Sequence, residues 1–332
     1  MEAYDPAAAP PAFGLNNTGV ICYFNSFLQA LAGCTSFTAE VLRAKQSYLC
    51  RTATGAAVAD FVAAYTAVPQ RADLATRSAA VLHALVADLA VRRPAVAFGA
   101  GQESASEALV HLLDMMEPPD TADSPITRLF RHRFRCEVHC RGCKKVVSSE
   151  KDHAVHFTLF EMDGLKTPPT TVESFSRAVR RQVSRTEDYR CPSCPCAACG
   201  TAAAGEGAAC AACGVPRRPA AAIREYNLTM IPEIVFCMFN LYVGYGGARR
   251  ARFFPPRLEF PGRGDDILFY ELVGQIEHSG SLSGGHYWAR GRRAGGAVHV
   301  LNDGAVSPGA FIPTVNTYVV VYHYAGRKPR EP

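Results

Sequence analysis

The chain has 332 residues, of which 48% are hydrophobic, so it can bury a substantial core in one large or two modest domains and is not generally disordered. Lysine and arginine number 35 against 30 aspartate and glutamate, which gives a net charge of +5, and the arginines are scattered along the chain. This balance argues against a nucleic-acid-binding protein, in which basic residues gather in one block.

The first thirteen residues, Met1 to Phe13, are rich in Ala and Pro and are expected to form a flexible lead-in. They lack the basic start and the apolar core of a signal peptide. We find no uninterrupted apolar run that approaches the roughly 20 residues of a membrane helix. We therefore expect an intracellular protein, cytoplasmic or nuclear, with no membrane partner. In that setting the 13 cysteines point to metal binding and catalysis, not to disulfides.

A polar turn, Asn16-Asn17-Thr18, lies shortly before a cysteine, Cys22. The apolar residues that follow have helical spacing, and they are Tyr23, Phe24, Phe27, Leu28 and Leu31. Cys22 is therefore expected where a loop enters an amphipathic helix. The helix dipole and the free N–H groups at that place favour the thiolate form of a cysteine. Most cysteines are inert packing residues, but one in this position is a candidate nucleophile.

The same stretch resembles the cysteine box of the ubiquitin-specific proteases (USPs), which are papain-like deubiquitinases. The matching residues are Gly14, Leu15, Asn17, Gly19, Cys22, Tyr23, Asn25, Ser26, Leu28 and Gln29. The resemblance implies that Cys22 is the nucleophile and that Asn17 supplies the side-chain donor of the oxyanion hole.

Residues 40–90 are rich in Ala, Val and Leu and are expected to form several helices of one lobe. A further helix is expected over 102–114, with Glu107 near its start. This segment resembles the Gln-Gln-Asp box of the USPs, but Glu103 replaces the second Gln and Ser104 replaces the Asp. Because the family's Asp helps to bind the substrate tail, the resemblance implies tail contacts near Gln102 and leaves the role of Ser104 open.

From Leu129 onward the hydrophobic period changes from helical to strand-like. Strands are expected over 130–139, 155–160, 227–243, 267–276, 287–290, 298–301 and 317–324, with one helix over 170–181. Helices first and a sheet second predict an α+β fold. The resemblance implies a papain-like USP catalytic domain over 14–325, with a helical thumb (14–128), a β palm (129–325), zinc-ribbon fingers (roughly 134–240) and a tail from 326 to 332.

Four Cys-x-x-Cys pairs occur between residues 140 and 213: Cys140/Cys143, Cys191/Cys194, Cys196/Cys199 and Cys210/Cys213. Two such pairs together supply the four thiolates that a structural zinc ion prefers, and such a closed site leaves no position for chemistry. The resemblance implies one four-cysteine zinc ribbon that begins with Cys140/Cys143. The second pair of that ribbon stays open between Cys191/Cys194 and Cys210/Cys213. We expect one zinc site, with a second as a hypothesis.

Nucleic-acid binding is a less favoured alternative, in which the ribbon would present Arg217, Arg218 and Arg224 to phosphates. It leaves the cysteine box unexplained.

A thiol nucleophile needs a base within hydrogen-bond reach and a third group that orients the imidazole. His286 follows a Gly- and Ser-rich loop, Ser279 to Gly285, and begins a strand with His-Tyr, a pattern similar to the histidine box of the USPs. Further on, Asn302 stands at the position of the third catalytic residue in a segment that resembles the family's, although its Asn-Asp-Gly sequence is also typical of a hairpin turn. Asp303 is the alternate candidate, or a helper near the oxyanion site.

Together these features predict a ubiquitin-specific-type isopeptidase that acts through a thioester on ubiquitin, polyubiquitin or ubiquitinated proteins, as a monomer. A protease for another ubiquitin-like modifier, a protease of ordinary peptides and a non-catalytic ubiquitin-binding module are the alternatives. The resemblance implies a narrow channel for the Gly-Gly tail. Its expected lining residues are Gln102, Ser104, Gly284, Gly285 and Tyr287, and the glycines of the 279–285 loop are expected to gate it.

Overall fold

A computed structural model gives the fold of the chain. The residues it describes are 1–17, 19, 21–67, 73–99, 103–120, 124–153, 157–159, 169–191, 193–194, 220–239, 251–262, 264–281 and 284–329. The described chain forms two compact units. Unit 1 comprises Met1–Arg131, Ala154–Ser176 and Pro232–Pro332, and unit 2 comprises His132–His153 and Arg177–Ile231.

The first part of unit 1 is helical, as the sequence predicts. Its helices are α1 (Cys22–Ala32), α2 (Thr35–Ala44), η1 (Leu49–Arg51), α3 (Ala53–Thr66), α4 (Leu74–Arg92), α5 (Ala105–Met116) and α6 (Pro125–Arg128). Side-chain oxygens cap several of these helices: Thr52 accepts from the Gly55 N–H before α3, and Ser104 accepts from the Ser106 N–H before α5. The unit boundary falls within α7 (Val172–Arg180).

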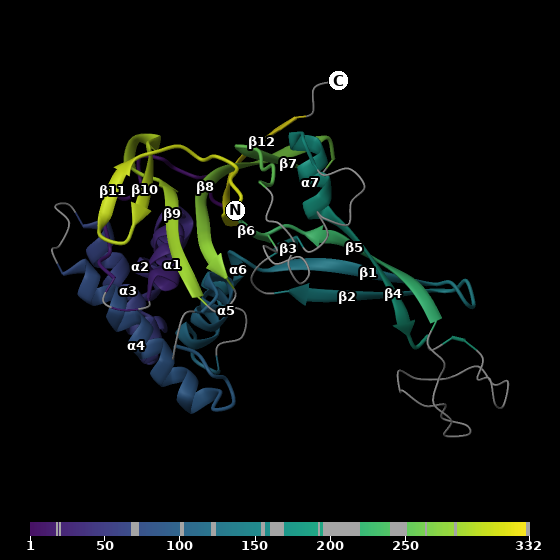
Figure 1. The fold of residues 1–332 in the computed structure, drawn as a ribbon, viewed down its shortest axis with the longest axis horizontal. Coiled ribbons are helices and arrows are strands. Elements are labelled where there is room, and N and C mark those ends of the chain that lie inside the picture. Colours follow the sequence, from purple (N-terminus) through teal and green to yellow (C-terminus); the bar gives the residue numbers. More distant parts are fainter. Residues whose placement is uncertain are drawn as a thin grey trace. The chain divides into compact units, whose positions relative to one another are not determined.

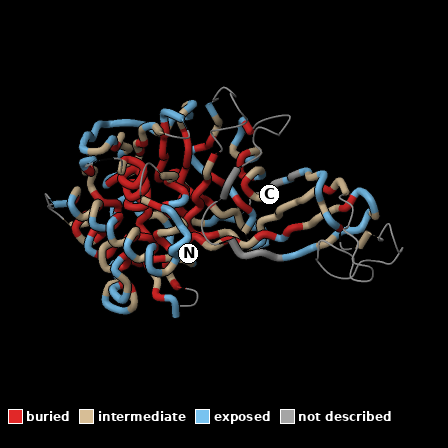
Figure 2. Tube along the Cα trace, turned by 60° about the horizontal axis from the view of Figure 1, so that its bottom comes forward, coloured by how far each residue is buried: buried red, intermediate tan, exposed pale blue. Residues whose placement is uncertain are grey.

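All the residues of α1 are buried, which corrects the expectation of an amphipathic helix with one exposed face. In Figure 2, where buried residues are red, the tube is red through the centre of the helical part. The two long polar side chains of the helix are satisfied internally. Asn25 Nδ2 donates to Leu15 O at 3.1 Å, and Gln29 Nε2 donates to Phe13 O at 2.6 Å. The helix can therefore be enclosed without stranding a polar group.

Among the described residues, α4 alone is long and apolar enough to span a membrane by length and composition, a feature the sequence survey did not identify. It packs against α3 and α5 in unit 1. Its buried residues are Leu74, Ser78, Val81, Leu82, Leu85 and Leu89, which is the stripe of a core helix.

In the described part of unit 1, eight strands form one sheet in the order β11-β10-β9-β8-β12-β6-β3, with β7 paired to β8 (Figure 1). Their bounds are β3 (Phe157–Leu159), β6 (Ile234–Phe239), β7 (Arg257–Pro261), β8 (Asp266–Ser281), β9 (Gly284–Arg292), β10 (Val298–Asn302), β11 (Ala305–Pro308) and β12 (Thr317–Pro329). Only β3 pairs in parallel, with β6, among these neighbours. Helix α1 packs against β8, β9 and β10.

The described part of unit 2 holds a second sheet of four strands in the order β2-β1-β5-β4. The strands are β1 (His132–Cys140), β2 (Val146–His153), β4 (Arg181–Tyr189) and β5 (Ala220–Met230). All three pairings are antiparallel. Unit 2 lies largely within the range predicted for the fingers, whereas residues 154–176 belong to unit 1.

The strand predicted over 227–243 is wrong as a single element. β5 ends at Met230, and a new strand, β6, begins at Ile234 in the other sheet. Pro232 lies between them, and proline cannot donate a ladder hydrogen bond in a strand interior. Residues 240–243 lie outside the described residues.

The N-terminal segment packs onto unit 1 although we expected it to be flexible. The Tyr4 N–H donates to Tyr324 O at 2.6 Å, and the Pro10 carbonyl accepts from Ala294 N–H at 3.1 Å, beside the short helix η2 (Ala294–Gly296). The boundaries of the predicted catalytic domain stay a prediction.

Candidate active site

Cys22 is the first residue of α1, at the loop-to-helix junction that the pattern predicts. The Ile21 carbonyl accepts from the N–H groups of Phe24 at 3.0 Å and Asn25 at 2.9 Å, so helical bonding begins next to the cysteine. Cys22 is 4% exposed. Helix α1, which begins with Cys22, packs against β9, the strand that carries His286, in unit 1 (Figure 1).

His286 lies near the start of β9, and Asn302 ends the adjacent strand β10. Nε2 of His286 lies 2.6 Å from Oδ1 of Asn302. An amide oxygen only accepts, so Nε2 carries the hydrogen in this bond and Nδ1 is the nitrogen that can take up a proton. The structure thus places one of the two candidate orienting residues directly on the imidazole.

Asp303, the alternate candidate, bonds a different group. It occupies the hairpin turn between β10 and β11 with a positive φ of 49°, and its carbonyl accepts from the Leu15 N–H at 2.8 Å. Its Oδ1 accepts from Asn25 Nδ2 at 3.4 Å. A side chain at Gly14 would collide with the Gly304 carbonyl, so this glycine permits the close approach of the two segments. Asp303 therefore ties the turn after Asn302 to the segment before Cys22.

The Asn17 side chain is fixed through its oxygen. Asn17 Oδ1 accepts from the N–H groups of Gly19 at 3.1 Å and Ile21 at 3.3 Å. None of the residues that the structure describes accepts a hydrogen bond from Asn17 Nδ2. An exposed amide whose oxygen is anchored in this way has its N–H donors available to a ligand.

The residues expected to bind the substrate tail lie on different elements of the structure. Ser104 caps α5, and its Oγ lies 2.6 Å from the Tyr318 hydroxyl. Tyr287 is 7% exposed and its ring packs against that of His278, with centroids 4.2 Å apart and an angle of 32° between the planes, on the face of β9 opposite to His286. Gln102 lies outside the described residues.

The predicted loop 279–285 is mostly strand, which corrects that expectation. β8 runs to Ser281 and β9 starts at Gly284, and Gly280 pairs with Gly285 between them. A Cβ on Gly285 would collide with the Ser279 carbonyl, so glycine allows the two strands to approach here. Residues 282 and 283 lie outside the described part.

In unit 2 the structure brings together two cysteine pairs, Cys140/Cys143 and Cys191/Cys194. Their four sulfurs lie within 4.8 Å of one another. Cys140 Sγ is 3.5 Å from Cys194 Sγ, and Cys143 Sγ is 3.6 Å from Cys191 Sγ. Four sulfurs held tetrahedrally at the zinc–sulfur distance of about 2.3 Å would be separated by slightly less than 4 Å. The cluster can therefore hold a metal ion of this kind.

The thiols of this cluster differ in acidity. A hydrogen bond from the Lys145 backbone N–H lowers the pKa of Cys143 to about 7. Burial raises the pKa of Cys194 to about 12. A metal ion that took all four as thiolates would displace protons, so its binding would be pH-dependent.

The second predicted cysteine set cannot be placed, because Cys196, Cys199, Cys210 and Cys213 lie outside the described residues, as do Arg217 and Arg218.

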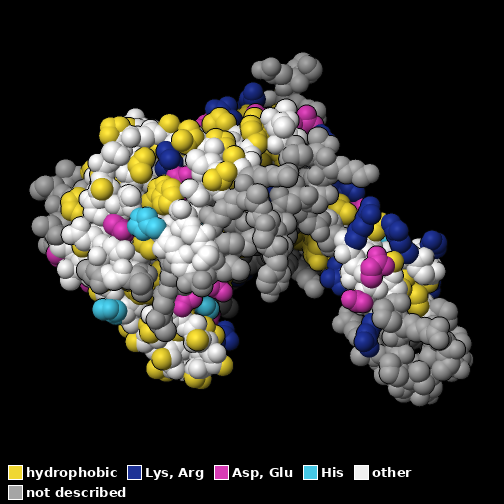
Figure 3. All heavy atoms as spheres, viewed as in Figure 1, with side chains coloured by type: hydrophobic (Ala, Val, Ile, Leu, Met, Phe, Trp, Pro, Cys, Tyr) yellow, Lys and Arg dark blue, Asp and Glu magenta, His cyan; other side chains and the backbone are white. Residues whose placement is uncertain are grey.

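Another group in unit 2, Glu137, His139 and Glu225, also has its ligand atoms within 4.8 Å. Glu225 is already ion-paired with Arg181 at 2.9 Å. In Figure 3 Lys and Arg side chains gather over this unit with acidic side chains among them, which is a mixed surface.

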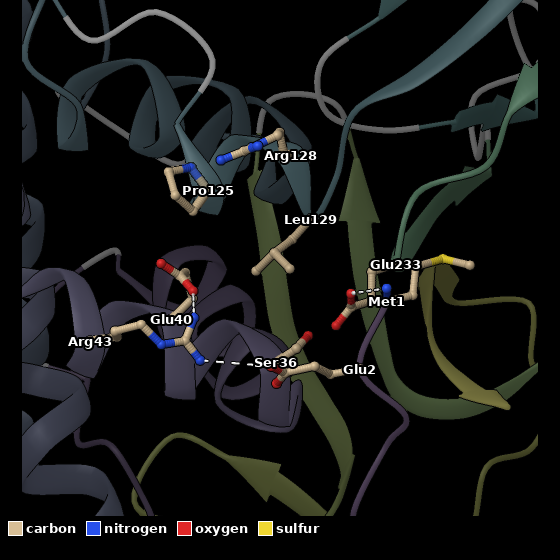
Figure 4. A pocket seen from close by; sticks show the side chains of 9 residues that line it. All are labelled: Met1, Glu2, Ser36, Glu40, Arg43, Pro125, Arg128, Leu129 and Glu233. Atoms are coloured by element: carbon tan, nitrogen blue, oxygen red, sulfur yellow. Dashed lines mark hydrogen bonds and ion pairs between the residues drawn. The ribbon is translucent and has the colours of Figure 1, made fainter.

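A cavity of about 360 Å³ in unit 1 lies apart from these groups. Its lining residues are Met1, Glu2, Ser36, Glu40, Arg43, Pro125, Arg128, Leu129 and Glu233 (Figure 4). Arg43 pairs with Glu40, three residues before it on α2, and the amino group of Met1 lies 3.9 Å from Glu233. None of the predicted site residues lines this cavity.

Sequence reasoning missed several residues that hold the site together. Buried Arg293 donates through Nη2 to Gln29 O at 2.7 Å and to Gln29 Oε1 at 2.9 Å, near the end of α1. Asn25 and Gln29 were known only as positions of the cysteine box. No local pattern marks Arg293, because its partner lies more than two hundred residues away.

The chain is similar to known proteins in sequence and in fold. The family model described as ubiquitin carboxyl-terminal hydrolase matches residues 13–322. A protein named ubiquitin carboxyl-terminal hydrolase 36, from Drosophila virilis, is 23% identical over 344 residues, which cover 94% of this chain and 25% of that protein. This chain thus spans about a quarter of the length of that relative.

Solved structures share the fold. The SAGA DUB module of Ubp8, Sgf11, Sus1 and Sgf73 bound to monoubiquitin matches with a TM-score of 0.66 at 16% identity, over 97% of this chain and 70% of that chain. A yeast SAGA DUB module with an Sgf73 mutant matches with a TM-score of 0.68 at 15% identity, over 98% of this chain and 71% of that chain.

Proposed function

Because the chain belongs to the ubiquitin carboxyl-terminal hydrolase family, whose members are cysteine peptidases, we propose that it is a deubiquitinating isopeptidase. It would hydrolyse the bond after the C-terminal glycine of ubiquitin. The observation that carries this proposal is the 2.6 Å bond between His286 and Asn302 on strands next to the helix that begins with Cys22.

In this proposal the Cys22 sulfur attacks the carbonyl carbon of the terminal glycine. His286, oriented through Nε2 by Asn302, takes the proton of the Cys22 thiol on Nδ1 and delivers it to the departing lysine amine as the isopeptide bond breaks. A thioester then joins Cys22 to the glycine. Water that gives up a proton to His286 hydrolyses the thioester and frees the thiol and the carboxylate.

The oxyanion that forms in each step needs donors placed before the reaction begins. The free Nδ2 of Asn17 is suited to this role because Gly19 and Ile21 hold its oxygen. A donor of this kind stabilises the transition state by about 3 kcal/mol in comparable sites. The Cys22 backbone N–H is the second proposed donor.

Ubiquitin is the proposed substrate, and a ubiquitin-like modifier is the alternative that one observation favours. The family's carboxylate for the tail is replaced by Ser104, whose hydroxyl is bonded to Ser106 and Tyr318. Few contacts are needed to switch a specificity. We propose Gln102, Gly284 and Gly285 as further tail contacts.

The four-cysteine cluster would bind one zinc ion in a structural role. Its donor set is the one that closed zinc sites use, and its sulfur spacing fits. The ion would connect the turn after β1 to the segment after β4 and so stiffen the end of unit 2. A second ion on the remaining cysteines stays a hypothesis.

The test is cleavage of a ubiquitin C-terminal fluorogenic amide by the wild type and by Cys22→Ala, with adduct formation by a ubiquitin-based electrophile. The proposal expects cleavage and adduct only with Cys22 present. Binding without an adduct would identify a non-catalytic module, and cleavage by Cys22→Ala at the wild-type rate would refute the mechanism. A panel of ubiquitin-like probes then decides the modifier.

A further inference from the structure

A carboxylate is buried close to the proposed base. Glu277 on β8 is 1% exposed, and its register partner across the β8–β9 pair is Trp288. Glu277 Oε2 accepts from Trp288 Nε1 at 2.7 Å and from Arg290 Nε at 2.6 Å. Its Oε1 accepts from the Thr314 hydroxyl at 2.6 Å. Burying a carboxylate is costly, and here the cost is offset because both oxygens are hydrogen-bonded and a cation is adjacent.

The partner of this carboxylate touches the imidazole. His286, Trp288 and Arg290 alternate along β9 and so share one face of the sheet. The indole of Trp288 stacks on the imidazole of His286, with ring centroids 6.0 Å apart and an angle of 23° between the planes. Asn302 holds Nε2 of the same ring. The imidazole is therefore restrained by a hydrogen bond at one atom and by a flat neighbour on its face.

We infer that Glu277 is a positioning residue for His286 and acts through Trp288. The inference rests on the proposed role of His286 as the base. An indole on a strand can rotate about its side-chain bonds unless its N–H is engaged, and Glu277 engages it from the facing position. With the indole fixed, the imidazole keeps one plane, and Nδ1 points along one direction. Misplacing a catalytic group by about 1 Å can reduce a rate by about 100-fold.

The hydrogen bonds around Glu277 extend beyond β8 and β9 to the segment between β11 and β12. Arg290 Nη1 donates to Ala310 O at 3.0 Å, and the Thr314 hydroxyl that bonds Glu277 also accepts from the Asn316 N–H at 3.1 Å. Glu277 thus links the face of β9 to the segment between β11 and β12. No other described acidic side chain bonds a residue that stacks on His286.

The test compares Glu277→Leu, which has no acceptor for the Trp288 indole N–H, with Trp288→Phe and the double variant in cleavage of the ubiquitin fluorogenic amide. Each single variant is expected to lower kcat about tenfold with KM within about twofold, because ring position changes and substrate contacts do not. The double variant is expected to match the single ones, since both remove the same link. Wild-type kcat in either single variant, or effects that multiply in the double variant, would overturn the inference.

Glu271→Leu is the matched control, because Glu271 lies on the same strand and bonds the surface residue Arg257 at 2.9 Å. It is expected to keep wild-type kcat. Circular dichroism checks that each variant folds, and if Glu277→Leu does not fold, Trp288→Phe carries the test alone.

The rate at which iodoacetamide alkylates Cys22, followed by peptide mass mapping, can be measured without ubiquitin. It therefore tests the role of Glu277 separately from the proposed activity on ubiquitin. If the wild type does not cleave ubiquitin conjugates, the proposed function is refuted, but the rate of Cys22 alkylation still tests the inference about Glu277. The inference expects both His286→Ala and Glu277→Leu to slow alkylation. Slowing by His286→Ala alone would refute the role of Glu277 only, and no slowing by either would refute both.

Discussion

His323 predicts how the stability of unit 1 depends on pH. Its side chain is fully buried on β12. Nε2 accepts from the Ser36 N–H at 3.2 Å and lies 2.7 Å from the Ser36 hydroxyl, while Nδ1 lies 2.8 Å from Tyr324 O. The neutral tautomer with hydrogen on Nδ1 satisfies both nitrogens. A second proton on Nε2 would face the Ser36 N–H.

Burial is the largest cause that lowers the pKa of His323, from 6.5 to about 4. The unfolded chain therefore binds this proton below pH 6.5, and the folded protein binds it only below about pH 4. Stability from this residue is fully present above pH 6.5 and is lost as the pH falls toward 4. At about 1.4 kcal/mol for each pKa unit, the loss between pH 6.5 and pH 5 amounts to about 2 kcal/mol.

Urea unfolding at pH 7.5 and pH 5.0 measures this loss. The chain has one tryptophan, Trp288, which lies in unit 1, so its fluorescence follows that unit alone. His323→Gln removes the titrating group and keeps an oxygen that can accept from Ser36. It is expected to be less stable at pH 7.5 but to lose about 2 kcal/mol less than wild type on acidification. Equal losses in the two proteins would refute the reasoning, because the other titrating groups are the same in both.

Three further predictions concern the site and the metal. Asn302→Ala should lower kcat about 10- to 100-fold and Asn302→Asp much less, as steady-state kinetics will show; equal losses would contradict the orienting role. Asn17→Ala should lower kcat about 100-fold at an almost unchanged KM, and a pure KM effect would place Asn17 in substrate binding instead. Cys194→Ser should reduce bound zinc, measured by mass spectrometry, while Cys22 alkylation stays at the wild-type rate; undiminished zinc would remove Cys194 from the site.

The chemistry of the site could be predicted from the sequence because it depends on short motifs. Cys22 at a helix start and His286 at a strand start each need only local context, and the structure places both as predicted. The resemblance to the USPs is confirmed by the family match over 13–322. The role of each residue stays a prediction.

What could not be predicted depends on contacts between distant segments. The partner of Cys140/Cys143 stayed open between two pairs with the same spacing, and only the fold brings Cys191/Cys194 to them. Strands β2 and β4 were not predicted, because polar residues dominate them and they lack a strand-like hydrophobic pattern. Their strand structure depends on backbone pairing with neighbouring strands. The role inferred for Glu277 could not be predicted from the residues around it, because it depends on the strand register that places Glu277 opposite Trp288.

The buried polar contacts of α1 explain how a helix without an exposed face keeps a defined position. Apolar side chains alone would enclose it but would specify its rotation and its displacement along the axis only weakly. Asn25 near the start bonds Leu15 O and Asp303, and Arg293 near the end bonds the carbonyl and the side chain of Gln29. The bonds to Leu15 O and to Gln29 are buried, and there a shift of the helix would leave a polar group unpaired at a cost of about 1–3 kcal/mol. The helix that begins with Cys22 is therefore held in one register with the strands that carry His286 and Asn302 by groups other than Cys22, His286 and Asn302 themselves.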